Sequence, residues 1–369
     1  MSTFITAIGT AVPQYKIEQE SVAQWLLETL GLDAHNMRLT EALYEGSGIK
    51  SRYSVLADYS HKIGSFAFYP NTLGLEPFPS VGRRMEVYKR EALPLALNAI
   101  GSLRTKKDFN PSEITHLITV SCTGMYAPGL DIELIETLGL KDEVERTGIQ
   151  FMGCYAAFNA LKSADYIIRS RADAKVLIVC LELCTLHFQK KQSRDNTVSN
   201  AIFGDGAAAV LVEGTPNGGK AYLSIDAFYS GLAKEGKRDM AWHIADSGFE
   251  MTLSARVPNA IHSGIRNLTE KLLHRFEIGQ QDVSYYAIHP GGRRILEACE
   301  GALELSKNDN RFSYEVLSDY GNMSSPTVIF VLEKILNAAQ KSSKQKNILS
   351  FAFGPGLTME SALLGLHYS

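Results

Sequence analysis

The chain has 369 residues, 45% of them hydrophobic and 21% charged, a composition typical of a globular protein built as two domains or one large layered α/β unit. Its 37 basic and 40 acidic side chains give a net charge of −3, which argues against nucleic acid or an anionic membrane as the main partner. No apolar run approaches the ~20 residues that span a bilayer. Five scattered cysteines and no secretory leader predict a reduced, cytoplasmic protein with no membrane segment.

The same order of elements is predicted twice along the chain: strand, helix, strand, helix, strand, strand. In the first half these elements are predicted at residues 4–12, 87–103, 114–122, from 154, 175–182 and 206–212. In the second half they are predicted at residues 221–229, 258–276, 285–289, from about 327, 347–353 and 357–366. The two sets meet near the turn-rich residues 214–219.

The character of these elements predicts the fold class. Residues 176–179 form a continuous Val-Leu-Ile-Val run, typical of a strand buried on both faces in a sheet that helices cover. Residues 53–82 are irregular and are predicted to form a long loop at the mouth of a site. We therefore expect an α/β protein of two similar halves, 1–215 and 216–369, packed around one site.

Three short segments each combine a small-residue turn with one reactive or polar side chain before a predicted helix. Cys154 follows Gly153, at a helix N-terminus where unpaired N–H groups and the helix dipole favour thiolate over thiol. His289 ends a strand and precedes Pro-Gly-Gly, so that its imidazole can point into a cavity. Asn322 lies in a Gly-Asn turn before an apolar helix and is a candidate hydrogen-bond donor.

Each of these residues also has a plainer structural explanation. A lone cysteine is usually a packed small hydrophobe, a lone histidine at a strand end is usually satisfied locally, and Gly-Asn is usually a left-handed turn. Taken together, however, Cys154, His289 and Asn322 are the groups that acyl transfer through a covalent thioester needs. The thiolate would attack a thioester carbonyl, and the imidazole and amide would stabilise the developing oxyanion or enolate.

Two other patterns are weaker. Residues 214–220 match a phosphate-binding loop, but Ala221 stands where Ser or Thr must reach Mg²⁺, and a strand follows instead of a helix. Cys180 and Cys184 lack the spaced histidine pair of a zinc site. We therefore expect no nucleotide-binding loop and no bound metal.

The sequence resembles the chalcone-synthase-like type III polyketide synthases of the thiolase superfamily, as a bacterial-type member, over residues 4–366. The most specific matches are the segments 153–154, 201–209, 288–292, 317–325 and 353–358. The resemblance implies a layered α-β-α-β-α fold made of two βαβαββ-type halves. It also implies a starter acyl-CoA loaded on cysteine, decarboxylative Claisen condensation with malonyl-CoA and cyclisation to a pyrone, resorcinol or related aromatic, with no cofactor.

The resemblance also assigns roles residue by residue. Cys154 is the nucleophile and acyl carrier, and His289 and Asn322 hold the extender carbonyl and stabilise its enolate. Phe203 matches an aromatic gatekeeper beside the cysteine. Further substrate contacts fall on Ser324 and on the loop Gly354, Pro355 and Gly356, which resembles the segment that shapes the cyclisation cavity.

Several positions depart from the plant enzymes. Met251 stands where they carry a second gatekeeper phenylalanine, and a Met wall is more adaptable. At cavity positions that are usually threonine, this chain has Cys122, Cys184 and His187. The family is typically dimeric and donates a methionine across the interface, where this chain has Ala127.

The basic residues that grip CoA phosphates in plant homologues are not matched near residues 39–46. Lys50 and Arg52 are the candidates to replace them, and the alternatives are surface salt bridging or a starter delivered by a carrier protein.

Two rival functions remain at this point. A ketoacyl synthase III also uses Cys, His and Asn, whereas an HMG-CoA synthase needs a general-base glutamate near its cysteine, and none is obvious in the sequence. A non-catalytic partner subunit with the same fold would be expected to have lost part of the Cys154, His289 and Asn322 set. The starter, the number of extensions and the mode of cyclisation are not predicted.

Overall fold

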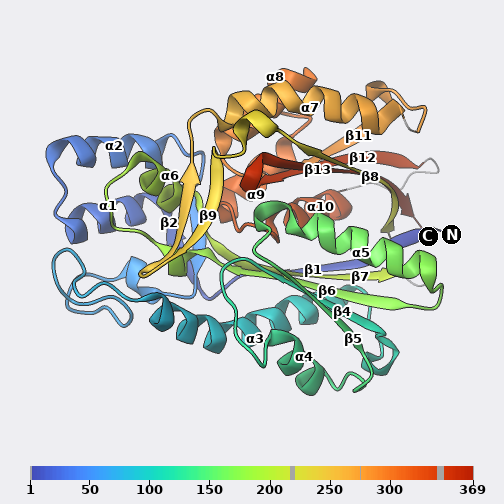
Figure 1. Cartoon of the computed structure of the whole chain (residues 1–369), viewed down its shortest axis with the longest axis horizontal. Coiled ribbons are helices and arrows are strands. Elements are labelled where there is room, and N and C mark those ends of the chain that lie inside the picture. The colour runs from blue at the N-terminus through green and yellow to red at the C-terminus, as the bar shows by residue number, and fades with distance from the viewer. Residues whose placement is uncertain (1, 217–220, 275, 339–344, 369) are drawn as a thin grey trace.

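The computed structural model describes residues 2–216, 221–274, 276–338 and 345–368, and its helices and strands lie in five alternating layers (Figure 1). The two strand layers are separated by a central pair of helices and covered on their outer sides by two further pairs. From one outer side to the other, the helix layers are α3 (Val81–Lys106) with α4 (Leu130–Leu138), α5 (Ala156–Ser170) with α10 (Thr327–Ala338), and α7 (Val257–His274) with α8 (Arg293–Leu303). This is the expected α-β-α-β-α arrangement.

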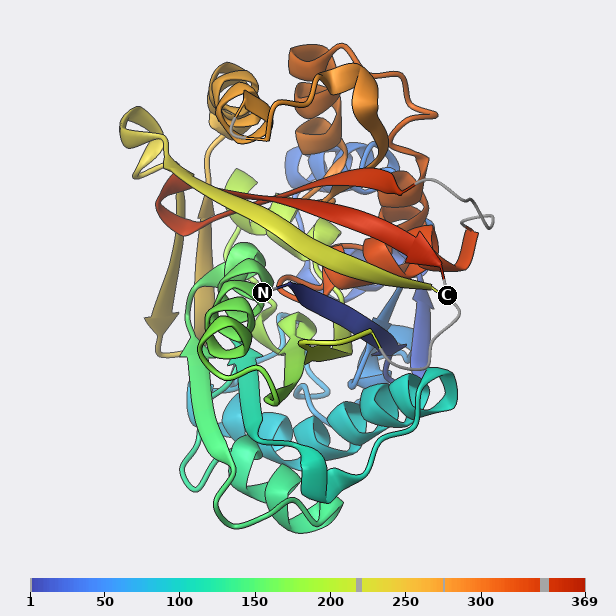
Figure 2. The same cartoon turned by 90° about the vertical axis from the view of Figure 1, so that its right-hand side faces the viewer.

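The nine long strands form two groups that join at one edge. The first group, in spatial order, is β5 (Glu145–Gln150), β4 (His116–Ser121), β6 (Lys175–Leu183), β7 (Asp205–Glu213) and β1 (Thr3–Ala11). The second is β8 (Ala221–Leu232), β13 (Thr358–Tyr368), β12 (Lys346–Gly354) and β11 (Val283–Ile288). Residues 3–5 of β1 pair with residues 223–225 of β8, and Figure 2 shows β1 in dark blue below β8 in yellow, where the groups meet.

The two groups have the same internal pairing. In the first, β4 and β6 are parallel, and β7 is antiparallel to both β6 and β1. In the second, β11 and β12 are parallel, and β13 is antiparallel to both β12 and β8. Strands β1, β4, β6 and β7 therefore correspond to β8, β11, β12 and β13. Among the described residues, β5 alone of the nine has no counterpart in the other group.

A set of shorter elements, which the sequence patterns did not reveal, lies at one end of these layers. Helices such as α2 were missed because they bury few side chains: only Thr40 and Tyr44 of α2 are buried. The set comprises β2 (Tyr15–Glu18), α1 (Gln19–Leu30), α2 (Ala34–Glu45), β3 (Ser51–Ser54), α6 (Arg194–Ile202), the hairpin β9 (Met240–Ala245) with β10 (Gly248–Leu253), and α9 (Arg311–Tyr320).

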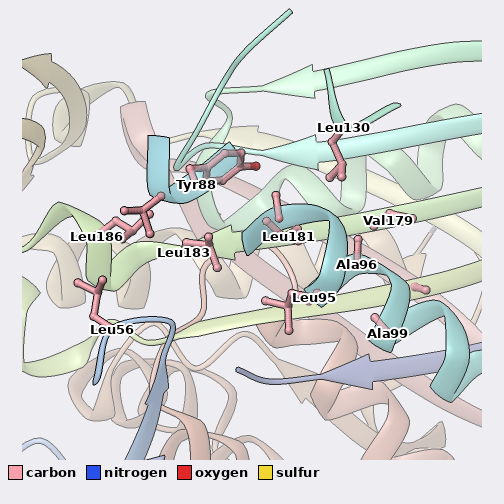
Figure 3. Packing of buried hydrophobic residues seen from close by; sticks show 14 of the residues in the cluster. Leu56, Tyr88, Leu95, Ala96, Ala99, Leu130, Val179, Leu181, Leu183 and Leu186 are labelled. Atoms are coloured by element: carbon pink, nitrogen blue, oxygen red, sulfur yellow. The ribbon is translucent and has the colours of Figure 1, made fainter. Parts of the chain in front are cut away.

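The core of the first half forms where α3 packs on the strands (Figure 3). Ala96 and Ala99 of α3 are fully buried near Leu181 of β6. Burying one leucine side chain such as this stabilises the folded state by about 1.5–3 kcal/mol. Gly9 of β1 lets the helix approach, because a Cβ there would lie 2.1 Å from the backbone nitrogen of Leu103. Small residues on both elements thus set the distance between helix and sheet.

Within the described residues, no helix combines the length and the apolar character needed to cross a membrane. All five cysteines are buried free thiols. Cys154 and Cys184 each line one of the two cavities described below, whereas Cys122, expected as a cavity wall, lines neither.

Candidate active site

The structure brings Cys154, His289 and Asn322 to one open cavity of about 240 Å³. Cys154 comes from the first half of the chain, and the other two come from the second half. Phe203 and Met251 also line this cavity. All five residues were candidates from the sequence, so residues scattered over 169 positions of the chain meet at one place.

Cys154 lies in a single 3₁₀ turn, η3 (Gly153–Tyr155), directly before α5. The turn needs glycine at position 153, where φ is +75° and a Cβ would lie 2.5 Å from the Cδ of Pro355. Only 8% of Cys154 is exposed, and this burial raises the pKa of its thiol to about 11 against the opposing hydrogen bonds of Ser324 and Asn322. The expectation of a stable thiolate was therefore wrong for this state, because desolvation outweighs the helix N-terminus.

His289 directly follows β11, and its backbone N–H continues the pairing by donating to the carbonyl of Phe351 at 2.8 Å. Its side chain is 1% exposed, and neither ring nitrogen has a hydrogen-bond partner among the residues that the structure describes. Burial lowers the pKa of His289 to about 3, so the ring is neutral and offers one donor and one acceptor. A buried ring with two unused nitrogens is costly unless a ligand supplies the partners.

Asn322 is fixed by its backbone as well as its side chain. It forms an isolated parallel bridge with Phe203, in which the N–H of Asn322 donates to the carbonyl of Ile202 at 2.8 Å. Its Oδ1 accepts from the N–H of Ser324 at 2.8 Å, while Nδ2 donates to the carbonyl of Gly291 at 3.3 Å. The amide lies 3.9 Å from the Sγ of Cys154. The side chain therefore holds an N–H donor beside the thiol of Cys154.

A second, smaller cavity of about 40 Å³ shares Phe203 and Met251 with the first. These two side chains therefore stand between the two spaces. Cys184 and His187, expected as cavity walls, line the smaller one. Trp242 of β9 also lines it, with its ring 6.3 Å from that of Phe203, and had not been identified from the sequence.

His187 also joins two segments of the chain through both of its ring nitrogens. Its Nε2–H donates to the carbonyl of Thr123 at 2.6 Å, and its Nδ1 accepts from the N–H of Phe249 at 3.0 Å. Its ring stacks on that of Phe249 with centroids 4.1 Å apart, and burial lowers its pKa to about 3. Trp242 also holds the same hairpin in place, because its indole N–H donates a hydrogen bond to the carbonyl of Cys122 at 2.8 Å. The β9–β10 hairpin is thereby held against the segment after β4.

Glu182 lies at the centre of a hydrogen-bonded cluster beside the cysteine. One carboxylate oxygen accepts from the N–H of Cys122 at 2.9 Å and the hydroxyl of Thr123 at 2.7 Å. The other accepts from the hydroxyl of Ser325 at 2.7 Å and the Cys122 thiol at 3.3 Å. Burial raises the pKa of Glu182 despite these donors. Cys122 Sγ also lies 3.3 Å from Ser324 Oγ, so Ser324 links this cluster to the cavity.

The sequence shows no obvious general-base glutamate near the cysteine, and no Asp or Glu is among the described residues that line the cavity of Cys154. The buried Glu182 itself could have been noticed, because it is an acid inside the apolar run 176–183, and a charge in such a strand needs buried partners. Its relation to Cys154, through Cys122 and Ser324, depends on strand pairing that the sequence does not display.

Several expected contacts lie elsewhere. Gly354, Pro355 and Gly356 do not line either cavity; Pro355 packs behind the cysteine turn, and a Cβ at Gly354 would lie 2.5 Å from the ring of Tyr155. They support the site from outside because the β12–β13 turn passes under η3. Ala127 is exposed and also lies outside both cavities.

Neither of the two candidate CoA-binding residues lines the large cavity, although Arg52 lines the smaller one. Arg52 is 5% exposed, and its guanidinium donates to the carbonyls of Asn200 at 2.7 Å and Phe203 at 2.5 Å, so it braces the gatekeeper segment. Lys50 is exposed and does not line the large cavity. The loop predicted at the mouth, residues 53–82, contributes nothing to the wall of the large cavity, because its aromatic side chains pack around Trp25 of α1. One of its residues, Tyr59, lines the smaller cavity.

The arrangement suits chemistry at a carbonyl. A thiol that can form a thioester shares a largely apolar cavity with two neutral groups, His289 and Asn322, that can donate hydrogen bonds. Among the described residues, no group of three or more His, Cys, Asp or Glu side chains is arranged to hold a metal ion.

Comparison with known families gives two matches that together cover most of the chain. Residues 2–216 match the model of the N-terminal domain of chalcone and stilbene synthases, and residues 229–366 match that of their C-terminal domain.

Individual relatives agree with this assignment. The chain is 29% identical to the alpha-pyrone synthesis polyketide synthase-like Pks18 of Mycobacterium tuberculosis, over 98% of this chain and 91% of that protein. It is 31% identical to the probable polyketide synthase 1 of Dictyostelium discoideum, over 98% of this chain but only 11% of that much longer protein. The crystal structure of PKS-I from the brown alga Ectocarpus siliculosus superposes with a TM-score of 0.91 at 30% identity, covering 99% of this chain and 98% of the other.

Proposed function

This chain belongs to the chalcone and stilbene synthase family of type III polyketide synthases, and from that membership we propose which reaction its residues perform. It loads a starter acyl group from a CoA thioester onto Cys154 and extends it with malonyl-CoA. It then cyclises the product to a pyrone, resorcinol or related aromatic. The observation that carries the proposal is the pair of unpartnered His289 ring nitrogens in the cavity of Cys154.

Loading begins from the thiol, because burial disfavours its ionisation before substrate arrives. As Sγ of Cys154 attacks the thioester carbonyl, its proton passes to the acceptor nitrogen of neutral His289. The C–S bond to CoA then breaks, and the departing CoA thiolate takes that proton. The enzyme is left acylated on Cys154 with His289 neutral again.

Extension uses His289 and Asn322 as hydrogen-bond donors to the second substrate. The malonyl thioester carbonyl accepts hydrogen bonds from the His289 ring N–H and from Nδ2 of Asn322. The bond to the carboxylate breaks, CO₂ leaves, and its electron pair becomes an enolate that these donors stabilise. The enolate carbon attacks the acyl carbonyl on Cys154 and releases the cysteine thiolate. The apolar ring of Phe203 favours loss of the carboxylate charge.

No cofactor is required in this scheme, since the thioesters supply the activation. The last step closes the chain on itself within the cavities that Phe203 and Met251 separate. A pyrone is one of the expected products, and the name of the Mycobacterium tuberculosis relative, which refers to alpha-pyrone synthesis, supports it for this chain.

The proposal is tested by incubating the protein with malonyl-CoA and a panel of acyl-CoAs and following CO₂, acyl-enzyme and products by mass spectrometry. We expect a covalent acyl adduct, lost in Cys154→Ala, and cyclised polyketides from at least one starter. Failure to release CO₂ with every starter would overturn the synthase assignment. An acyl adduct that persists in Cys154→Ala would move the nucleophile to another residue.

We also propose that the protein acts as a homodimer. Strand β5 lies at the edge of the sheet, and an edge strand offers unpaired backbone groups to a second chain. Met125, 43% exposed, and Ala127 stand on the neighbouring segment, in keeping with a wall shared between subunits. Sedimentation equilibrium should give twice the chain mass, and a monomer at all concentrations would contradict the proposal.

A further inference from the structure

The large cavity carries a distinctive charge pattern at its wall. Three charged residues line it, Arg194, Arg293 and Arg294, and no Asp or Glu is among the described lining residues. In a chain whose acidic side chains outnumber its basic ones, an all-arginine set on one cavity is a specific arrangement. The cavity therefore favours a ligand that is anionic at one end.

These arginines come from two helices that begin at the cavity. Arg194 is the first residue of α6, and Arg293 and Arg294 are the first residues of α8. Arg194 and Arg294 form no ion pair with any described residue. Arg293 contacts Glu297 at 2.8 Å, with both side chains more than two-fifths exposed, so this pair is weak. The guanidinium groups are thus available to an incoming anion.

The rest of the wall leads from these charges to the reactive cysteine. Helix α2 contributes Ala42 and Leu43 to the same wall, and both are uncharged. At its buried end the same cavity holds Cys154 and the unpartnered ring of His289. One cavity therefore joins a cationic entrance to a buried end that lacks hydrogen-bond partners.

Building on the proposed function, we propose that Arg194, Arg293 and Arg294 bind the phosphate groups of the CoA thioester while its pantetheine arm runs along α2 to Cys154. Planar guanidinium groups recognise phosphate through paired hydrogen bonds. Three of them suit CoA, which carries a diphosphate and a 3′-phosphate, better than a carrier protein's pantetheine arm, which carries one phosphodiester. These arginines take the place of Lys50 and Arg52.

Isothermal titration with CoA itself tests the assignment without requiring turnover. The double variant Arg194→Gln/Arg294→Gln should bind CoA about a hundred-fold more weakly, since each of the two lost charge-assisted contacts is worth about a factor of ten. Its affinity for pantetheine, which has no phosphate, should not change. Arg104→Gln is the matched control, because Arg104 ends α3 on an outer layer and is ion-paired with Asp108.

An unchanged CoA affinity in the double variant would overturn the inference, and so would a ten-fold loss in Lys50→Gln. Steady-state kinetics separates this failure from failure of the proposed function. We expect the double variant to raise KM for acyl-CoA at least ten-fold without changing turnover of N-acetylcysteamine thioesters, which lack phosphate. Equal losses on both substrates would overturn the phosphate role while the synthase assignment stands. Turnover from an acylated carrier protein but not from acyl-CoA would overturn CoA as the source.

Discussion

The equivalent strands β4 and β11 end in opposite chemical situations. After β4, Cys122 gives its N–H and its thiol to Glu182, so that its polar groups are satisfied within the protein. After β11, His289 has no described partner for either ring nitrogen. The comparison teaches that the first position is satisfied within the protein, whereas the second is a place where a ligand completes the hydrogen bonding.

The central helices show the same division. Helix α5 begins just after Cys154, and its counterpart α10 begins shortly after Asn322. One topological position thus carries the cysteine that we propose as the nucleophile in the first half and an amide donor in the second. Because each half holds only part of the machinery, the reaction we propose needs both.

The largest effect on rate should come from His289, whose ring nitrogens have no described partner. Replacing His289 by Ala removes a donor aimed at the developing enolate, and we expect malonyl-CoA decarboxylation to fall about 10²–10³-fold, the usual cost of one such donor. Asn322→Ala should fall by a similar factor. Radiolabelled CO₂ release measures both. A loss below about three-fold in His289→Ala would show that the empty nitrogens do not face the substrate.

The second prediction concerns a buried acid whose hydrogen bonds are made within the protein, and it concerns how the free energy of unfolding depends on pH. Asp205, which begins β7, accepts from the N–H of Val55 at 2.9 Å and from the N–H of Thr185 at 2.8 Å, yet burial raises its pKa to about 7. Between about pH 4 and pH 7 the unfolded chain loses this proton while the folded chain keeps it. The contribution of Asp205 to the free energy of unfolding therefore falls as pH rises through that window and is constant above it.

Urea denaturation of the wild type and Asp205→Asn at pH 5, 6, 7 and 8 measures this contribution. Relative to the variant, the wild type should lose about 2–3 kcal/mol between pH 5 and pH 7. A difference between the two proteins that stays constant with pH would show that Asp205 is ionised in the fold.

Glu182→Gln tests whether the hydrogen bonds around Cys122 stabilise the fold. The amide turns an NH₂ group toward donors that now meet a carboxylate oxygen, so we expect the free energy of unfolding to fall by about 1–3 kcal/mol. Glu136→Gln, on the exposed face of α4, should change it by less than about 0.5 kcal/mol. Equal effects in the two variants would mean that the cluster around Glu182 does not stabilise the fold.

The smallest change in rate, with a change in product, should follow Trp242→Ala. This substitution removes the bond to the Cys122 carbonyl and opens the space beside Phe203. We expect longer polyketides from the same starter, measured by mass spectrometry, while Trp242→Phe keeps most of the volume and the original product. An unchanged product in Trp242→Ala would place the growing chain entirely in the larger cavity.

The sequence predicted what local patterns encode. The nine-residue strand β6 was recognisable because residues 176–179 form an apolar run. Cys154, His289 and Asn322 were recognisable because each joins a reactive group to a glycine-containing turn. The layered fold, implied by family resemblance, is confirmed by the structure and its relatives.

What escaped the sequence depends on relations between distant segments. Arg52 carries the right charge for CoA, but its direction, toward the carbonyl of Phe203, follows from how β3 meets α6. The acidity of Cys154 was misjudged because burial, which raises its pKa, is a property of the assembled cavity. The three arginines at the cavity wall were overlooked because α6 and α8 lie about 100 residues apart in the chain and meet only in the fold.

The position of β13 has a consequence for synthesis on the ribosome. This strand follows β12 in the chain, yet it lies between β8 and β12 and pairs with both along most of its length. The second half therefore lacks the middle of its sheet until residues 358–368 have been made. A nascent chain can complete the strands around Cys154 early, but β8 and β12 must wait with exposed edges, so this half is the part most prone to aggregate during translation.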